Sequence, residues 1–184
     1  MFSKLLIRVA RELKKADIPY MVIGGQAVLL YGEPRLTKDI DITLGIGIDG
    51  FERIRNVALN LNLHILVKKP EMFIQTTMIL PVKDEKTGIR VDFIFSFTPY
   101  EKQAIERAID VKIRGSKVRF ASLEDVIIHK IIAGRVRDIE DVKSVLLKNP
   151  QYDVRYIKKW LKKFDDSLNE NFLKIFQQVL KEIK

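Results

Sequence analysis

Two aspartates one residue apart, Asp39 and Asp41, lie inside the apolar run DIDITL at residues 39–44. The alternation of polar and apolar residues predicts a half-buried strand, whose side chains two apart point to the same face. Adjacent carboxylates repel each other, and one of them holds a proton unless a cation lies between them. Oxygen ligands at this spacing suit Mg²⁺ or Mn²⁺. The alternative is that both aspartates are solvated or paired with Arg35 and Lys38.

A third aspartate, Asp92, lies in a second apolar segment, IRVDFIF at residues 89–95. A carboxylate that points into a protein is costly unless it is paired or binds a metal. If the strand at 89–95 lies beside the strand at 39–44, three carboxylates converge on one point. Such a cluster can hold two metal ions, one that activates an attacking hydroxyl and one that neutralises a triphosphate and its leaving pyrophosphate.

The pair Gly24-Gly25 lies between a predicted strand at 20–23 and a predicted helix at 26–31. Backbone N–H groups at such a helix start have no partner within the helix, and the helix dipole adds positive potential. The turn therefore suits phosphate groups, and a glycine is needed because a Cβ would block their close approach. The alternative is a tight turn without a ligand.

The rest of the pattern predicts an α/β (α+β) fold, with a short mixed sheet flanked by helices and a helical C-terminal part. Further helices are expected at 2–16, 50–61 and 99–108, and antiparallel hairpins at 75–95 and 111–120. After Ser122, a good N-cap, the chain reads as helical to its end, with breaks at Gly134 and at Asn149-Pro150. We therefore predict an α/β core at residues 1–121 and a helical region at 122–184 that closes the cleft.

Composition narrows the class of protein. The 184 residues include no cysteine, which excludes thiol catalysis and thiolate metal sites. No apolar stretch approaches the roughly 20 residues that a membrane span needs, and the N-terminus resembles an amphipathic helix more than a signal peptide. These features predict a cytoplasmic protein with no membrane partner. A net charge of +9 attracts nucleotides, RNA or acidic proteins.

The order of these motifs resembles the signature of the DNA polymerase β-like nucleotidyltransferase superfamily. In this chain the order is a strand, Gly-Gly and a helix, then DID after a spacer of thirteen residues, and later a strand with VDF. The run GxxRxTxDID is similar to that of small stand-alone members, including AbiEii-type toxins and their uncharacterised relatives. The resemblance implies transfer of a nucleoside monophosphate from an NTP to a hydroxyl, with Asp39, Asp41 and Asp92 as ligands of Mg²⁺ or Mn²⁺. It also implies a tRNA or other RNA acceptor and an antitoxin partner. The nucleotide-binding set that it implies is Gly24, Gly25, Arg35, Thr37, Arg135 and Asp138.

The stretch HKIIAGRVRDIEDV at 129–142 looks like the last element of those proteins. The resemblance implies that Lys130 contacts the nucleotide phosphates and is catalytic, and that Arg135 lines the cleft. From the residues alone, Lys130 is more simply a solvated lysine, although helical spacing also allows a buried stem whose ammonium reaches a cleft. Asp138 fits an acidic helix start, or a carboxylate that fixes Lys130 or Arg135 by a hydrogen bond. Many members have Gly-Ser where this chain has Gly24-Gly25, so backbone N–H groups have to replace the serine hydroxyl.

Cations recur along the helices after Pro150, interleaved with aromatic residues. They are Arg155, Lys158, Lys159, Lys162, Lys163 and Lys174. This pattern fits an RNA-facing surface, and equally a solvated helix face. The alternative to an enzyme is a non-catalytic module that retains the fold and binds nucleotide or RNA. The sequence does not identify the acceptor or the preferred NTP.

Overall fold

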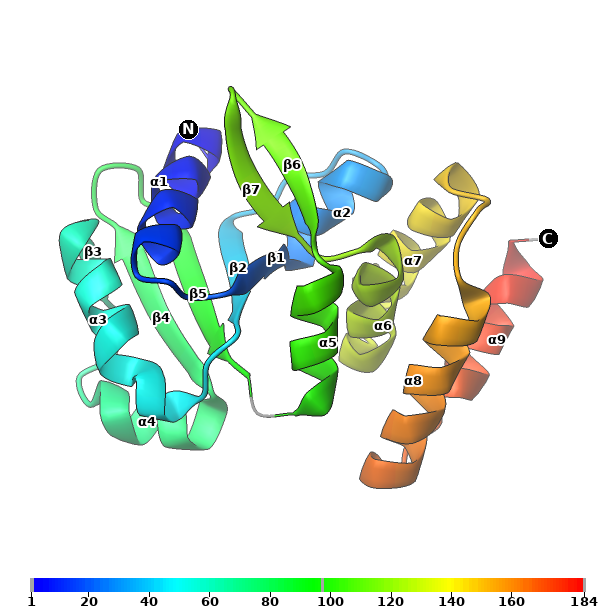
Figure 1. Cartoon of the computed structure of the whole chain (residues 1–184). Coiled ribbons are helices and arrows are strands. Elements are labelled where there is room, and N and C mark those ends of the chain that lie inside the picture. Colours follow the sequence, from blue (N-terminus) through cyan, green and yellow to red (C-terminus); the bar gives the residue numbers. More distant parts are fainter. Residues whose placement is uncertain (1, 97, 184) are drawn as a thin grey trace. The chain divides into compact units, whose positions relative to one another are not determined.

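A mixed sheet of seven strands forms the first unit of this computed structural model, which describes residues 2–96 and 98–183 (Figure 1). The strand order is β3–β4–β5–β2–β1–β7–β6. Strand β2 runs parallel to β5 and β1 runs parallel to β7, while the other neighbouring pairs are antiparallel. The mixed sheet and its flanking helices agree with the fold class predicted from the sequence.

The described residues form two compact units. The first comes from Met1–Gln26 and Leu36–Ala121, and the second from Ala27–Arg35 and Ser122–Lys184. The segment Ala27–Arg35, which the sequence analysis had placed in the α/β core, thus belongs to the helical unit. Within the described residues, no helix is long and apolar enough to cross a membrane.

The elements of the chain have the following bounds. The strands are β1 (Tyr20–Ile23), β2 (Asp39–Leu44), β3 (Leu63–Ile65), β4 (Ile79–Asp84), β5 (Arg90–Phe95), β6 (Ile109–Ile113) and β7 (Ser116–Phe120). The helices of the first unit are α1 (Phe2–Lys15), α3 (Phe51–Asn60), α4 (Pro70–Thr77) and α5 (Pro99–Arg107), with the short 3₁₀ turn η1 (Ile48–Gly50). Helix α2 (Gly24–Tyr31) passes from the first unit into the second, which contains α6 (Leu123–Ala133), α7 (Val136–Lys148), α8 (Val154–Leu168) and α9 (Phe172–Glu182).

Amphipathic patterns explain how the first unit builds its core. Helix α1 buries a stripe that includes Leu5, Val9 and Leu13, and α1 and α3 contact each other over the sheet (Figure 1). In β2, Ile40 and Ile42 are fully buried, whereas the aspartates that alternate with them are only half-buried. The face of β2 that carries the carboxylates is therefore opposite the face that carries the isoleucines.

The strand predicted at 75–82 is wrong in its first part, because residues up to Thr77 belong to α4. Pro70 at the first helical turn favours this helix, and Met78 ends it in the left-handed conformation at φ 60°. The hydroxyls of Thr76 and Thr77 donate to carbonyls one turn earlier, which satisfies these β-branched residues inside a helix. The helix start at Pro70 and the helix end at Met78 therefore outweigh the preference of the two threonines for a strand.

A missed strand, a helix start and a missed helix break also differ from the prediction. Strand β3 was missed because it has only three residues, and α2 begins at Gly24 instead of Gln26. The C-terminal region has a further break at Asn169, which ends α8 with φ 56°. There the Asp165 carboxylate accepts the backbone N–H groups at the start of α9, so the break is a capped turn.

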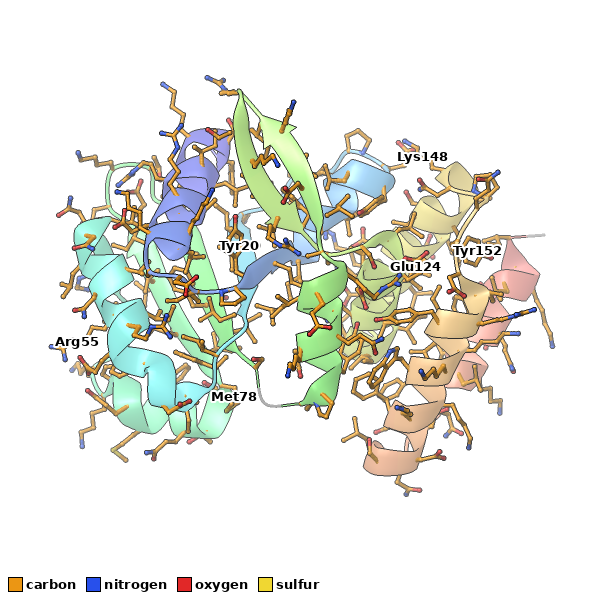
Figure 2. All side chains as sticks on the ribbon, viewed as in Figure 1. Tyr20, Arg55, Met78, Glu124, Lys148 and Tyr152 are labelled. Atoms are coloured by element: carbon orange, nitrogen blue, oxygen red, sulfur yellow. The ribbon has the colours of Figure 1, made fainter. Side chains whose placement is uncertain are left out.

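Hydrogen bonds and an ion pair fasten the segment Ala27–Arg35 to the end of α7. Lys148, labelled in Figure 2, pairs with Glu33 at 2.8 Å. The Ser144 hydroxyl accepts the Glu33 N–H at 2.6 Å, and the Asn149 amide donates to the Tyr31 carbonyl at 2.7 Å. These contacts explain why residues just before β2 fold with the C-terminal helices.

Candidate active site

Asp41 of β2 and Asp92 of β5 are direct neighbours across two parallel strands. The prediction that the two aspartate-bearing strands lie side by side is thus confirmed. In the same strand register, Asp39 lies opposite Arg90, and Asp39 is two residues before Asp41 on the same face of β2. Asp92 is 9% exposed, whereas Asp39 and Asp41 are half-buried. Three carboxylates therefore lie on one face of two adjoining strands.

Arg90 interacts electrostatically with all three aspartates. Its Nε donates to Asp92 Oδ1 at 2.7 Å, and about half of its side chain is exposed. The hydrogen bond to Asp92 raises the pKa of the Arg90 guanidinium. Burial opposes this rise, and the charges of Asp92, Asp39 and Asp41 add to it. The negative potential of all three carboxylates therefore reaches one cation.

The three carboxylates fit a divalent metal in donor type, because Mg²⁺ and Mn²⁺ prefer hard oxygen ligands. Their strand register also fits, with Asp41 beside Asp92. Their side chains are not yet gathered as a ligand sphere, since the described residues contain no group of three or more His, Cys, Asp or Glu side chains arranged to hold a metal. The bond from Arg90 to Asp92 is one reason, because the guanidinium takes up a carboxylate oxygen.

Gly24 lies against the carboxylate of Asp41. A Cβ built on Gly24 would lie 1.9 Å from Asp41 Oδ2 and 2.9 Å from its Cγ, and Gly24 has φ +62°. The turn between β1 and α2 therefore requires glycine for two reasons, its backbone conformation and its close approach to Asp41. The sequence analysis expected a glycine here because of phosphate binding, and did not foresee the contact with the aspartate.

Thr37 links the first turn of α2 to the start of β2. Its hydroxyl accepts from the Gln26 side-chain amide at 2.7 Å and donates to the Asp39 carbonyl at 3.4 Å. Gln26 was not among the predicted site residues, and nothing in the sequence motif singled it out. Thr37 and Gln26 together position the backbone that carries Asp39.

Buried charges of the second unit gather around Lys130. Its ammonium lies 2.6 Å from Asp138 Oδ1 and 2.9 Å from Asp141 Oδ2, and all three side chains are at most 7% exposed. Arg135 Nε donates to Asp138 Oδ2 at 2.5 Å, and Arg35 binds both oxygens of Asp141 at 2.9 Å. The alternative of a solvated Lys130 is wrong. The alternative that Asp138 fixes Lys130 or Arg135 by a hydrogen bond agrees with the structure, in which Asp138 binds both.

Helix geometry produces this cluster. Helix α6 ends at Gly134 with φ +65°, and α7 follows after Arg135. Asp138 lies in the first turn of α7, and Asp141 lies three residues further on, on the same face. Their spacing was visible in the sequence, but only Asp138 was assigned to the site.

The predicted site residues thus fall into two groups. The first unit contains Gly24, Gly25, Thr37, Asp39, Asp41 and Asp92, and the second contains Arg35, Lys130, Arg135 and Asp138. Arg35 is separated from Thr37 by one residue, yet its guanidinium is bound by Asp141 of α7.

Acid should weaken the Asp138 cluster. Although burial alone would raise the pKa of Asp138, hydrogen bonds from Arg135 and Lys130 lower it. A carboxyl group with a lowered pKa stabilises the fold fully above its unfolded pKa of about 3.9, and this contribution is lost as the pH falls further. Asp138→Asn should cost about 3 kcal/mol at pH 7, because it breaks a buried ion pair.

Urea unfolding between pH 7 and pH 3.5 tests this prediction. The free-energy advantage of the native chain over Asp138→Asn should shrink below about pH 4, because the aspartate then becomes protonated in the unfolded state. An advantage that stays constant over this range would contradict the prediction. Asp166→Asn, which removes an exposed ion pair with Lys162, is the control and should cost less than about 1 kcal/mol throughout.

The sheet topology and the aspartate pair define a nucleotidyltransferase fold. The chain belongs to the family described as nucleotidyltransferases of unknown function (DUF6036), whose model matches residues 4–183. Membership of this family indicates transfer of a nucleotidyl group, and the family description names no acceptor. The narrower resemblance to AbiEii-type toxins, with the antitoxin partner that it implies, stays a prediction. Comparison with curated proteins gave no significant sequence match.

Solved structures show the same fold at low sequence identity. The antibiotic-resistance factor ANT(2'')-Ia matches with a TM-score of 0.63 at 13% identity, over 91% of this chain and 92% of its own. An antigenic nucleotidyltransferase-like protein from Paracoccidioides brasiliensis matches with a TM-score of 0.57 at 17% identity, over 90% and 87% of the two chains. The lincosamide antibiotic adenylyltransferase LnuA matches with a TM-score of 0.55 at 18% identity, over 77% and 94%.

Proposed function

We propose that this protein transfers a nucleoside monophosphate from an NTP to a hydroxyl group of RNA, with Mg²⁺ or Mn²⁺ held by Asp39, Asp41 and Asp92. The observation that carries the proposal is the direct register of Asp41 and Asp92, with Gly24 packed against the Asp41 carboxylate. The three carboxylates are suited to bind a metal ion, and the start of α2 beside them is suited to bind phosphate.

The reaction forms a bond between the acceptor oxygen and the α-phosphorus of the NTP. The bond from the α-phosphorus to the bridging oxygen of the β-phosphate breaks, and pyrophosphate leaves with that electron pair. Asp92 accepts the proton of the attacking hydroxyl. The backbone N–H groups of Gly24 and Gly25 bind the β- and γ-phosphates. When bound, the metal ions lower the pKa of the hydroxyl and neutralise the triphosphate.

Two features of this chain complete the proposed site. Arg90 releases the Asp92 oxygen that it now binds, so that Asp92 can serve as a metal ligand. Lys130 contacts the phosphates of the nucleotide, and its ammonium offsets the charge of the transition state. Arg35, Thr37, Arg135 and Asp138 support nucleotide binding.

The proposal of an RNA acceptor is supported by a basic stripe on α8. The stripe consists of Arg155, Lys158, Lys159, Lys162 and Lys163, which are all exposed and lie three or four residues apart on one helix face. Lys162 pairs with Asp166, and the Lys163 ammonium lies 4.4 Å from the Trp160 ring centroid. Closely spaced exposed cations suit the phosphates of a nucleic-acid backbone.

The opposite face of α8 argues against a membrane surface as the partner of the basic stripe. A helix that lies on a membrane inserts its apolar face into the lipid. On α8 that face is already buried within the helical unit, with Ile157 and Leu161 at 0% exposure and Trp160 at 7%.

Transfer of label tests the proposed function. Purified protein is incubated with each α-labelled NTP, Mg²⁺ or Mn²⁺, and total tRNA. We expect label from one preferred NTP in RNA, and only when the metal is present. Replacing four cations of the basic stripe (Arg155, Lys158, Lys159 and Lys163) with Gln should lower the slope of log affinity for RNA against log salt by about 3.

A matched variant controls for net charge. Replacing four exposed lysines of the first unit with Gln (Lys68, Lys69, Lys83 and Lys86) removes the same charge and should leave the salt slope nearly unchanged. Equal effects of the two variants would contradict the basic stripe as the RNA surface. Mg²⁺-dependent NTP binding without transfer to any acceptor would favour the alternative, a non-catalytic binding module.

A further inference from the structure

The carboxylate of Asp141 binds two cations from distant parts of the chain. Arg35 Nε donates to Oδ1 and Arg35 Nη2 donates to Oδ2, both at 2.9 Å, and Lys130 Nζ lies 2.9 Å from Oδ2. Asp141 is 6% exposed, so this carboxylate is shielded from water. Bidentate pairing with arginine fixes orientation as well as distance, because the guanidinium and carboxylate planes have to align.

Charges of both signs surround Asp141. Lys130, Arg35 and Arg135 contribute three cations, and Asp138 and Asp141 contribute two anions. Two of the three N–H bonds of the Lys130 ammonium point to these carboxylates. The Lys130 ammonium is therefore held between the two carboxylates of α7.

Asp141 also fixes the chain where it enters β2. Arg35 is the last residue of the segment that folds with the helical unit, and Asp39 follows four residues later. Asp141 thus binds both Lys130, which we propose contacts the phosphates, and Arg35, which precedes β2 in the chain.

We propose that Asp141 is a positioning residue for NTP binding, because it orients the Lys130 ammonium and anchors Arg35 on α7. This inference rests on the proposed function, since it assumes that an NTP is the ligand. Asp141 does not touch the nucleotide. It acts by fixing the direction of both cations, and a cation held in place loses less entropy when it binds a phosphate.

A purely structural ion pair is the alternative. Replacing a buried ion pair by apolar residues of similar volume is often neutral or stabilising. The double variant Arg35→Met/Asp141→Leu should therefore recover the stability that the single variant Asp141→Asn loses. Because Arg35 itself is proposed to support nucleotide binding, the reference for affinity is the single variant Arg35→Met. If Asp141 serves only the fold, the double variant binds NTP as tightly as Arg35→Met. If Asp141 is a positioning residue, the double variant binds NTP more weakly than Arg35→Met, because the Lys130 ammonium has lost one of its two carboxylates.

Binding of each of the four Mg²⁺·NTPs by titration calorimetry provides the test, with thermal unfolding of the same samples. We expect Asp141→Asn to weaken the affinity of the native chain for its best NTP about tenfold. The double variant should bind at least about fivefold more weakly than Arg35→Met, although its unfolding temperature returns close to the native value. Glu140→Gln is the control, since Glu140 on the same helix pairs with Lys143 at the surface.

Each outcome has one meaning. Binding by the native chain with equal affinity in Asp141→Asn and Glu140→Gln overturns the positioning role and leaves the proposed function standing. Equal NTP affinities of the double variant and Arg35→Met also overturn it, in favour of a structural pair. Absence of NTP binding by the native chain contradicts the proposed function itself, and the positioning role with it.

Discussion

Asp41→Asn is expected to lower nucleotidyl transfer by roughly 10³-fold or more while the fold stays intact. Asp41 lies beside Asp92 and behind Gly24, so it belongs to both the proposed metal face and the proposed phosphate turn. An amide of the same size keeps the packing but removes one negative charge from the cluster. Because neighbouring carboxylates repel each other, stability should be unchanged or slightly higher.

Asp110→Asn is the matched control for this prediction. Asp110 lies on β6 of the same sheet, and its half-exposed side chain pairs with Lys117 at 3.1 Å. Its replacement removes the same charge and should leave transfer within about twofold of the native rate, because exposed pairs contribute little. Labelled transfer rates and thermal unfolding are measured for both variants. Undiminished transfer by Asp41→Asn would sink the metal mechanism.

Gly24→Ala is expected to lower transfer roughly 100-fold with only a modest loss of stability. The new Cβ would lie 1.9 Å from Asp41 Oδ2, which no pair of non-bonded atoms can tolerate. The Cβ would also lie 2.9 Å from Asp41 Cγ and 3.1 Å from Asp41 Cβ, so the whole Asp41 side chain has to rotate and β2 has to shift slightly at this residue. A rotated Asp41 no longer faces Asp92, and the added methyl group narrows the turn for phosphates.

Gly88→Ala separates the clash from the backbone cost. Gly88 also has a positive φ, at +71°, but a Cβ there meets no atom within 4 Å. Both alanines pay about 1–2 kcal/mol for a left-handed conformation, so urea unfolding should give them similar stabilities. Only Gly24→Ala should lose transfer. Equal activities of the two variants would show that the contact between Gly24 and Asp41 has no catalytic consequence.

The strands of the candidate site could be predicted from the sequence because their information is local. The alternation in DIDITL gave β2 its bounds, Asp39–Leu44, and the face of its aspartates followed from the period of two. Gly24 marked the turn before α2 because few other residues adopt its positive φ. These features depend on a residue and its nearest neighbours.

Residues 75–77 show where local reasoning failed. Their β-branched threonines favour a strand, but Pro70 and the left-handed Met78 define a helix around them. The segment Ala27–Arg35 shows a second kind of failure. It lies between two core elements in sequence, and yet its polar groups bind the end of α7 more than 100 residues away.

The sequence by itself determined the class of fold, the aspartate-bearing strands and the glycine turn, because side-chain period and backbone conformation are encoded within a few residues. Only the tertiary structure decided that Asp41 pairs with Asp92 and that Asp141 binds both Arg35 and Lys130. Strand order and buried ion pairs depend on which distant segments pack together. The free energy of that packing is a sum over the whole core, and no short stretch of sequence contains it.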